Sequence, residues 1–132
     1  MVAIQSKTKL ENYETEITSS SGHTLISDEP VEIGGKNKGM SPDELIIAAL
    51  SSCTSATLKM YAQRKEWDLK EIRTNIQFIK ADKPGLLPTI HREIELEGDL
   101  NEEQRERLFQ IANKCPIHKL ITNAIEISSE LK

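Results

Sequence analysis

The chain has 132 residues, a net charge of −4 and 37% hydrophobic residues, which suits a single domain over residues 1–132 with a core of its own. Its basic residues are not clustered as they are in nucleic-acid-binding proteins, and its N-terminus lacks the apolar stretch of a signal peptide. No apolar run approaches the 18 residues of a membrane-spanning helix, so we expect a cytoplasmic protein that binds neither nucleic acid nor membrane.

The first third of the sequence predicts short strands. Charged and apolar residues alternate loosely over residues 6–18, which indicates an edge strand. A turn at 19–22 and a strand at 23–27 would complete a hairpin. A short strand is expected at 31–33, followed by a flexible glycine-containing loop at 34–40.

The clearest signal in the sequence is a helix start. Ser41 fits the N-cap position, Pro42 the first helical position, and Glu44 completes a capping box. The helix should continue to about Lys65, and residues 45–58 carry no charge. A helix that is apolar or small on every side is expected to be buried on every side, here at the centre of the domain or of a dimer.

Two strands are predicted next, at 71–81 and 89–97, joined by a loop at 82–88. Apolar residues in the second strand occur at every other position, which indicates one buried face. Arg92 falls on this apolar side, which is unusual for a charged residue.

The remaining elements are two helices and a strand. A helix at 101–114, capped by Asp99 or Asn101, precedes a short helix at 117–123 that Pro116 opens. A final strand is expected at 124–131. Strands, a long helix, a strand pair, two helices and a strand together indicate the α+β class.

Cys53 and Cys115 are the candidate reactive groups. In a reducing compartment such residues are more often catalytic or metal-binding than linked in a structural disulfide. Cys53 lies in the uncharged helix, where burial would raise its pKa and make it inert. Cys115 fits the N-cap of a helix, where free backbone N–H groups favour a thiolate, and His118 follows one turn later. Local reasoning therefore favours Cys115 as the reactive thiol.

A metal centre built from Cys53, Cys115 and His118 is not expected, because the sequence has neither the CxxC nor the HxxxH spacing of zinc sites. His23 and His91 each stand alone in strand-like segments. No glycine-rich phosphate loop joins a strand to a helix, so we expect no cofactor.

Two segments resemble the OsmC/organic hydroperoxide resistance superfamily, in its OsmC-like branch. The first runs from the Gly39-Met40-Ser41-Pro42-Asp43-Glu44-Leu45 stretch into the small-residue helix Ala48-Ala49-Leu50-Ser51-Ser52-Cys53, and the second is Cys115-Pro116. The order of elements also fits, so the resemblance spans nearly the whole chain.

The resemblance implies the OsmC α+β fold and an intertwined homodimer with two active sites at the subunit interface. It implies that Cys53 is the peroxidatic thiol and Cys115 the resolving thiol. The residues next to each cysteine instead favour Cys115 as the reactive thiol. It also implies reduction of an organic hydroperoxide by an external dithiol, in an apolar pocket lined by Ile46, Ile47, Leu50 and residues of the second copy.

Two features depart from the family pattern. The reductases activate the peroxidatic cysteine with an arginine from the N-terminal strands, but no arginine precedes Arg64 here. They also place a glutamate ten residues before that cysteine, where this chain has Asp43 followed by Glu44. Asp43 and Glu44 are candidate catalytic residues, although both also suit the first turn of a helix.

Three functional hypotheses remain open. The first is a two-cysteine hydroperoxide reductase, and the second is a weakly catalytic or non-catalytic OsmC-like protein that binds an apolar or thiol-reactive small molecule. The third is the same fold with two inert cysteines. The low aromatic content of 4% and the uncharged helix both favour burial against a second copy.

Overall fold

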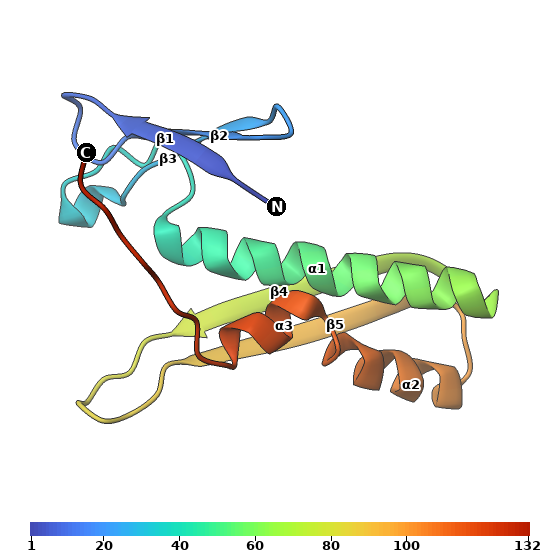
Figure 1. The fold of residues 1–132 in the computed structure, drawn as a ribbon. Coiled ribbons are helices and arrows are strands. Elements are labelled where there is room, and N and C mark those ends of the chain that lie inside the picture. Colours follow the sequence, from blue (N-terminus) through green and yellow to red (C-terminus); the bar gives the residue numbers. More distant parts are fainter. The chain divides into compact units, whose positions relative to one another are not determined.

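The computed structural model describes all 132 residues, which form two compact units, residues 1–46 and 47–132. Figure 1 labels the elements in chain order. They are β1 (Ile4–Thr8), β2 (Thr15–Ser19), β3 (Thr24–Ser27), η1 (Val31–Ile33), α1 (Pro42–Lys65), β4 (Asp68–Ile79), β5 (Thr89–Asp99), α2 (Glu102–Ala112) and α3 (Pro116–Ile121). This composition confirms the α+β class.

The first unit contains an antiparallel sheet in the order β1-β2-β3. The single strand expected at 6–18 is wrong, because a turn separates β1 from β2 and pairs Thr8 with Thr15. Tyr13 in this turn has a φ of 61°, and the segment carries neither glycine nor proline to signal the reversal. The second hairpin is confirmed, with Gly22 at a φ of 94° between β2 and β3.

The strand expected at 31–33 is also wrong. These residues form the single 3-10 turn η1, which starts after Pro30 and ends at Gly34 with a φ of 99°. Nearby, the carboxylate of Asp28, which is 1% exposed, accepts hydrogen bonds from the backbone N–H groups of Glu29, Lys36 and Lys38 at 2.7, 3.2 and 3.2 Å. The segment expected to be a flexible loop is therefore anchored at two of its amides, Lys36 and Lys38.

The start of α1 agrees with the sequence. Ser41 Oγ accepts from the Glu44 N–H at 3.3 Å, and the Glu44 carboxylate accepts from the Ser41 N–H at 3.2 Å, which completes the capping box. By length and composition alone α1 could cross a membrane, which differs from the expectation that no apolar stretch of the sequence is long enough. A single helix of this kind is weak evidence, because core helices of soluble proteins meet the same criterion.

Burial of α1 on every side is not seen in the single chain. Its buried residues are Leu50, Thr54, Leu58, Tyr61 and Ala62. A second stripe is exposed and contains no charged residue: Ile46, Ala49, Ser52, Ala56 and Met60. The uncharged sequence of α1 therefore supplies two separate faces. One of them is buried within the chain, and the other is exposed.

In the second unit, β4 and β5 form an antiparallel hairpin whose inner face packs against the helices (Figure 1). Leu58 of α1 and Leu108 of α2 are completely buried in this core. Ile72, Ile94 and Leu96 of the hairpin pack against it. On the outer face, Arg73 forms salt bridges with carboxylates of both strands.

The expected final strand at 124–131 is wrong. The segment forms no strand, and Ile125 and Ile127 are 55% and 87% exposed. Alternating apolar residues favour an extended conformation, but a strand also needs a neighbouring strand to supply hydrogen bonds. No such neighbour pairs with this segment within the chain.

Candidate active site

The second unit brings the two cysteines together. Cys53 lies in the middle of α1, and Cys115 is the N-cap residue of α3. Both are free thiols and lie close enough to shift each other's pKa, although they are 62 positions apart (115 minus 53). Cys115 has no exposed surface, whereas Cys53 is partly exposed.

The surroundings of Cys53 favour its thiolate. Burial raises the pKa of the Cys53 thiol, but hydrogen bonds from Cys115, the backbone N–H of Ile117 and the side chain of Thr57 outweigh it, and the pKa falls below its ordinary value. Thr57 lies one turn after Cys53 on α1, whereas Ile117 and Cys115 come from the α3 region.

Cys115 shows the opposite behaviour. Burial raises the pKa of the Cys115 thiol, and its hydrogen bond with Cys53 raises it further, while the amides of His118 and Ile117 only partly compensate. The local prediction that Cys115 has the lower pKa is therefore wrong, because burial and the contact with Cys53 outweigh the effect of the amides at the start of α3.

Arg92 lies beside this pair. From the inner face of β5, its Nη1 donates a hydrogen bond to Thr54 Oγ1 at 2.9 Å and its Nη2 donates to Asn113 Oδ1 at 3.0 Å. Burial lowers the pKa of Arg92, and the charge of Cys115 acts in the opposite direction. The unusual position of Arg92 in the sequence was the signal for its proximity to the thiols.

His118 is not the cation of this site. Burial lowers the pKa of its imidazole, and the positive charge of Arg92 lowers it further. A histidine with a lowered pKa is mainly neutral at pH 7. The positive charge near Cys115 therefore comes from Arg92.

The two acidic candidates lie in the first turn of α1. Glu44 completes the capping box with Ser41, and Asp43 lies in the same first turn of α1. Both belong to the first unit, whereas the thiols belong to the second. Their catalytic assignment stays a prediction, as does the apolar pocket expected at Ile46, Ile47 and Leu50.

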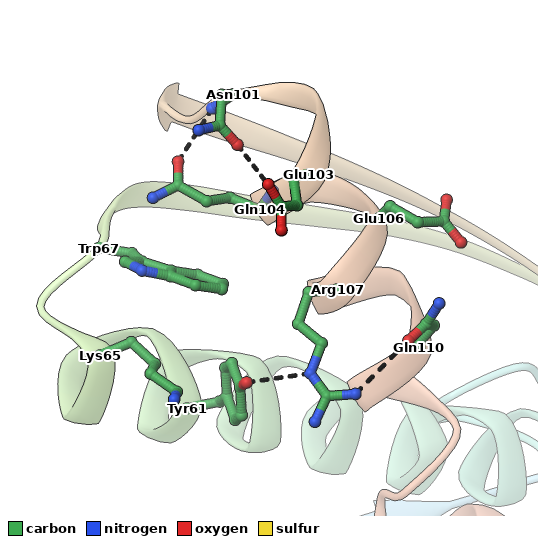
Figure 2. Close-up of a pocket in the computed structure, with 9 residues that line it drawn as sticks. All are labelled: Tyr61, Lys65, Trp67, Asn101, Glu103, Gln104, Glu106, Arg107 and Gln110. Atoms are coloured by element: carbon green, nitrogen blue, oxygen red, sulfur yellow. Dashed lines mark hydrogen bonds between the residues drawn. The ribbon is translucent and has the colours of Figure 1, made fainter.

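A cavity of about 640 Å³ lies in a different part of the second unit, between the end of α1 and α2 (Figure 2). Its wall includes Tyr61 and Trp67, whose rings meet edge to face with centroids 5.6 Å apart, and Arg107, whose Nε donates to Tyr61 Oη at 3.0 Å. The expected site residues do not line this cavity. No group of three or more His, Cys, Asp or Glu residues is placed to hold a metal ion.

Comparison with solved structures shows a shared fold. A putative osmotic stress induced and detoxification response protein from Psychrobacter arcticus is 24% identical, with a TM-score of 0.74 over 87% of this chain and 85% of that chain. An organic hydroperoxide resistance protein OsmC from Legionella pneumophila is 18% identical, with a TM-score of 0.70 over 92% and 88%. The organic hydroperoxide resistance protein OhrB of Bacillus subtilis is 21% identical, with a TM-score of 0.65 over 100% and 98%.

No curated protein sequence matches the chain. The profile of the family described as OsmC-like protein, however, matches residues 35–130, which contain both cysteines, all of α1 and the complete hairpin of β4 and β5. The chain therefore belongs to the OsmC-like protein family.

Proposed function

We propose that this protein reduces organic hydroperoxides with Cys53 as the peroxidatic thiol and Cys115 as the resolving thiol. The observation that carries the proposal is that two free thiols, far apart in sequence, lie close enough together for each to shift the pKa of the other. The names of the Legionella and Bacillus structures, which describe hydroperoxide resistance proteins, support the choice of substrate class.

The proposed reaction has three steps. The Cys53 thiolate attacks the O–O bond of the hydroperoxide, which leaves a Cys53 sulfenic acid and releases an alcohol after protonation. The Cys115 thiol then attacks the sulfenic sulfur, which forms the disulfide and releases water. An external dithiol reduces the disulfide by two exchange steps and is itself oxidised to a disulfide.

The partial exposure of Cys53 and the complete burial of Cys115 suit these separate roles. The attacking thiol has to meet a substrate from solution, and its lowered pKa increases the thiolate fraction at neutral pH. The resolving thiol needs access only to the Cys53 sulfur. A raised pKa keeps Cys115 protonated and unreactive toward other electrophiles until that sulfur is oxidised.

The proposal includes a homodimer in the cytoplasm. The exposed stripe on α1 is uncharged and runs through Ala49, Ser52 and Ala56, so a second copy of the helix could approach it closely. Asp43 or Glu44 would then contribute to a site completed by both copies. An arginine is absent from the first 63 residues, which favours a second candidate function, binding of a thiol-reactive small molecule with little turnover.

Steady-state consumption of cumene hydroperoxide in the presence of dithiothreitol separates the two candidates. The reductase is expected to turn over, and Cys53→Ser should abolish turnover. In the absence of dithiothreitol, Cys115→Ser should allow a single turnover and leave a Cys53 sulfenic acid. Mass spectrometry after one equivalent of peroxide should show the Cys53–Cys115 disulfide. A wild-type rate equal to that of Cys53→Ser would reject the reductase.

A further inference from the structure

The position of Arg92 is unusual for a charged side chain. It lies on the inner face of the β4–β5 hairpin, opposite Ile76 on β4 and between Ile90 and Ile94 on its own strand. Placing a charge on an apolar face costs free energy unless hydrogen bonds or an opposite charge compensate. The contacts of the guanidinium therefore have to account for its presence there.

Those contacts join the two segments that carry the thiols. Nη1 of Arg92 donates to Thr54, the residue after Cys53 on α1. Nη2 donates to Asn113, two residues before Cys115. A planar guanidinium holds two acceptors in a fixed relative orientation, whereas the single ammonium group of lysine does not.

The α1 end of this link is rigid. The Thr54 side chain is completely buried, and its hydroxyl donates to the Leu50 carbonyl at 2.7 Å while accepting from Arg92. Both hydrogen-bond acceptors of Arg92 are neutral, so neither cancels its charge. On the α3 side, the charge of Cys115 raises the pKa of Arg92, and the charge of Arg92 lowers the pKa of His118.

We propose that Arg92 is a positioning residue that aligns Cys53 with Cys115 for disulfide formation and supplies the fixed positive charge beside the pair. This inference rests on the disulfide-forming step of the proposed function. It does not depend on a peroxide as the oxidant. It also gives the site a cation from β5, although the N-terminal region contains no arginine.

The test uses diamide, an oxidant that needs no peroxide site. Two thiols form a disulfide, and diamide takes up the two electrons and two protons as its hydrazine. The rate of Cys53–Cys115 formation is measured in wild type, Arg92→Lys and Arg92→Met. Arg73→Met is the matched control, because it removes an arginine from the exposed outer face of the same hairpin.

Arg92→Met is expected to slow disulfide formation at least tenfold, and Arg92→Lys should also slow it, because one ammonium group cannot hold both acceptors. Thr54→Val should resemble Arg92→Lys, whereas Thr54→Ser keeps the hydroxyl and should behave like wild type. Arg73→Met should remain within twofold of wild type. Wild-type rates in both Arg92 variants would overturn the positioning role.

The charge role has its own readout. The His118 pKa, followed by NMR, should rise in Arg92→Met because a positive neighbour is lost, and should stay lowered in Arg92→Lys. An unchanged His118 pKa in a folded Arg92→Met would overturn the charge role. If Arg92→Met does not fold, the rates of Arg92→Lys and Thr54→Val decide the positioning role, and the His118 pKa in Arg92→Gln decides the charge role.

Failure of the proposed function would give a different experimental result from failure of the positioning role. Wild-type protein that forms the disulfide with diamide but does not consume cumene hydroperoxide would reject the reductase. The effects of the Arg92 variants on disulfide formation would still hold in that case. Brisk peroxide turnover with wild-type diamide rates in the Arg92 variants would instead reject the positioning role alone.

Discussion

The backbone N–H of Ile117, at the start of α3, lies close to the sulfur of Cys53 in the middle of α1 and lowers the pKa of its thiol. An amide from one segment thereby stabilises the thiolate of another. This contact helps to explain why Cys53, in a helix without charges around it, has a lowered pKa.

We predict that the pKa of Cys53 lies below that of an ordinary cysteine and that the pKa of Cys115 lies above it. Alkylation by iodoacetamide at Cys53 should reach half of its maximal rate at a lower pH than in a free cysteine, and Cys115 at a higher pH. Mass spectrometry of each peptide across a pH series measures both. Cys115→Ala should raise the pKa of Cys53, whereas Cys53→Ala should lower that of Cys115, because their hydrogen bond acts on the two groups with opposite sign.

The exposed stripe on α1 gives a prediction about assembly. Ala49→Arg, one turn before Cys53, should abolish the proposed dimer and leave little folded monomer, because it places a charge and a long side chain on a surface meant for close approach. Sedimentation at micromolar concentration measures the assembly state. Gln77→Arg adds the same charge on the outer face of β4 and should leave it unchanged. A compact wild-type monomer would refute the interface.

The core of the second unit should be sensitive to loss of volume. Leu108→Ala removes a completely buried side chain and should lower the free energy of unfolding by about 2–5 kcal/mol. Leu87→Ala, in the loop between β4 and β5, removes an 87% exposed side chain and should change it by less than about 0.5 kcal/mol. Urea unfolding at one protein concentration compares them, and equal effects would contradict the assigned core.

We expect the first unit to lose stability at acidic pH because of Asp28. Burial raises the pKa of its carboxyl group, but the three amide hydrogen bonds outweigh burial and lower it overall. A carboxylate whose pKa is lower in the folded state stabilises the fold above its unfolded pKa, and this contribution is lost as pH falls through the folded pKa. Asp28→Ala removes both acceptor oxygens, so it should weaken hydrogen-exchange protection of the Lys36 and Lys38 amides at neutral pH. Unchanged protection would contradict this role.

Local signals predicted the helices well. Ser41, Pro42 and Glu44 form a capping box that depends only on neighbouring residues, and Asn101 caps α2 in the same way with Gln104. Long-range information was needed for the strands. The segment at 124–131 has suitable alternation but no partner strand in the chain.

The candidate site also depended on long-range contacts that the sequence alone does not show. The sequence identified Cys53 and Cys115 and marked Arg92 as unusual, but spacing could not show that the guanidinium reaches both cysteine-bearing segments. The ranking of the two pKa values depended on burial and on the approach of the Ile117 amide to Cys53. Burial depends on the whole fold, and Ile117 follows Cys115 in the sequence, so its proximity to Cys53 could not be read from the neighbours of Cys53.

Because the two cysteines lie 62 positions apart (115 minus 53), a disulfide between them would change the stability of the protein. A crosslink that closes a loop of this length restricts the unfolded chain, and the entropic model assigns it roughly 4 kcal/mol of stabilisation. The oxidised protein would then be the harder form to denature. Its resting, reduced form would be the one most easily degraded, so exposure to an oxidant would lengthen the lifetime of the molecule that consumes it.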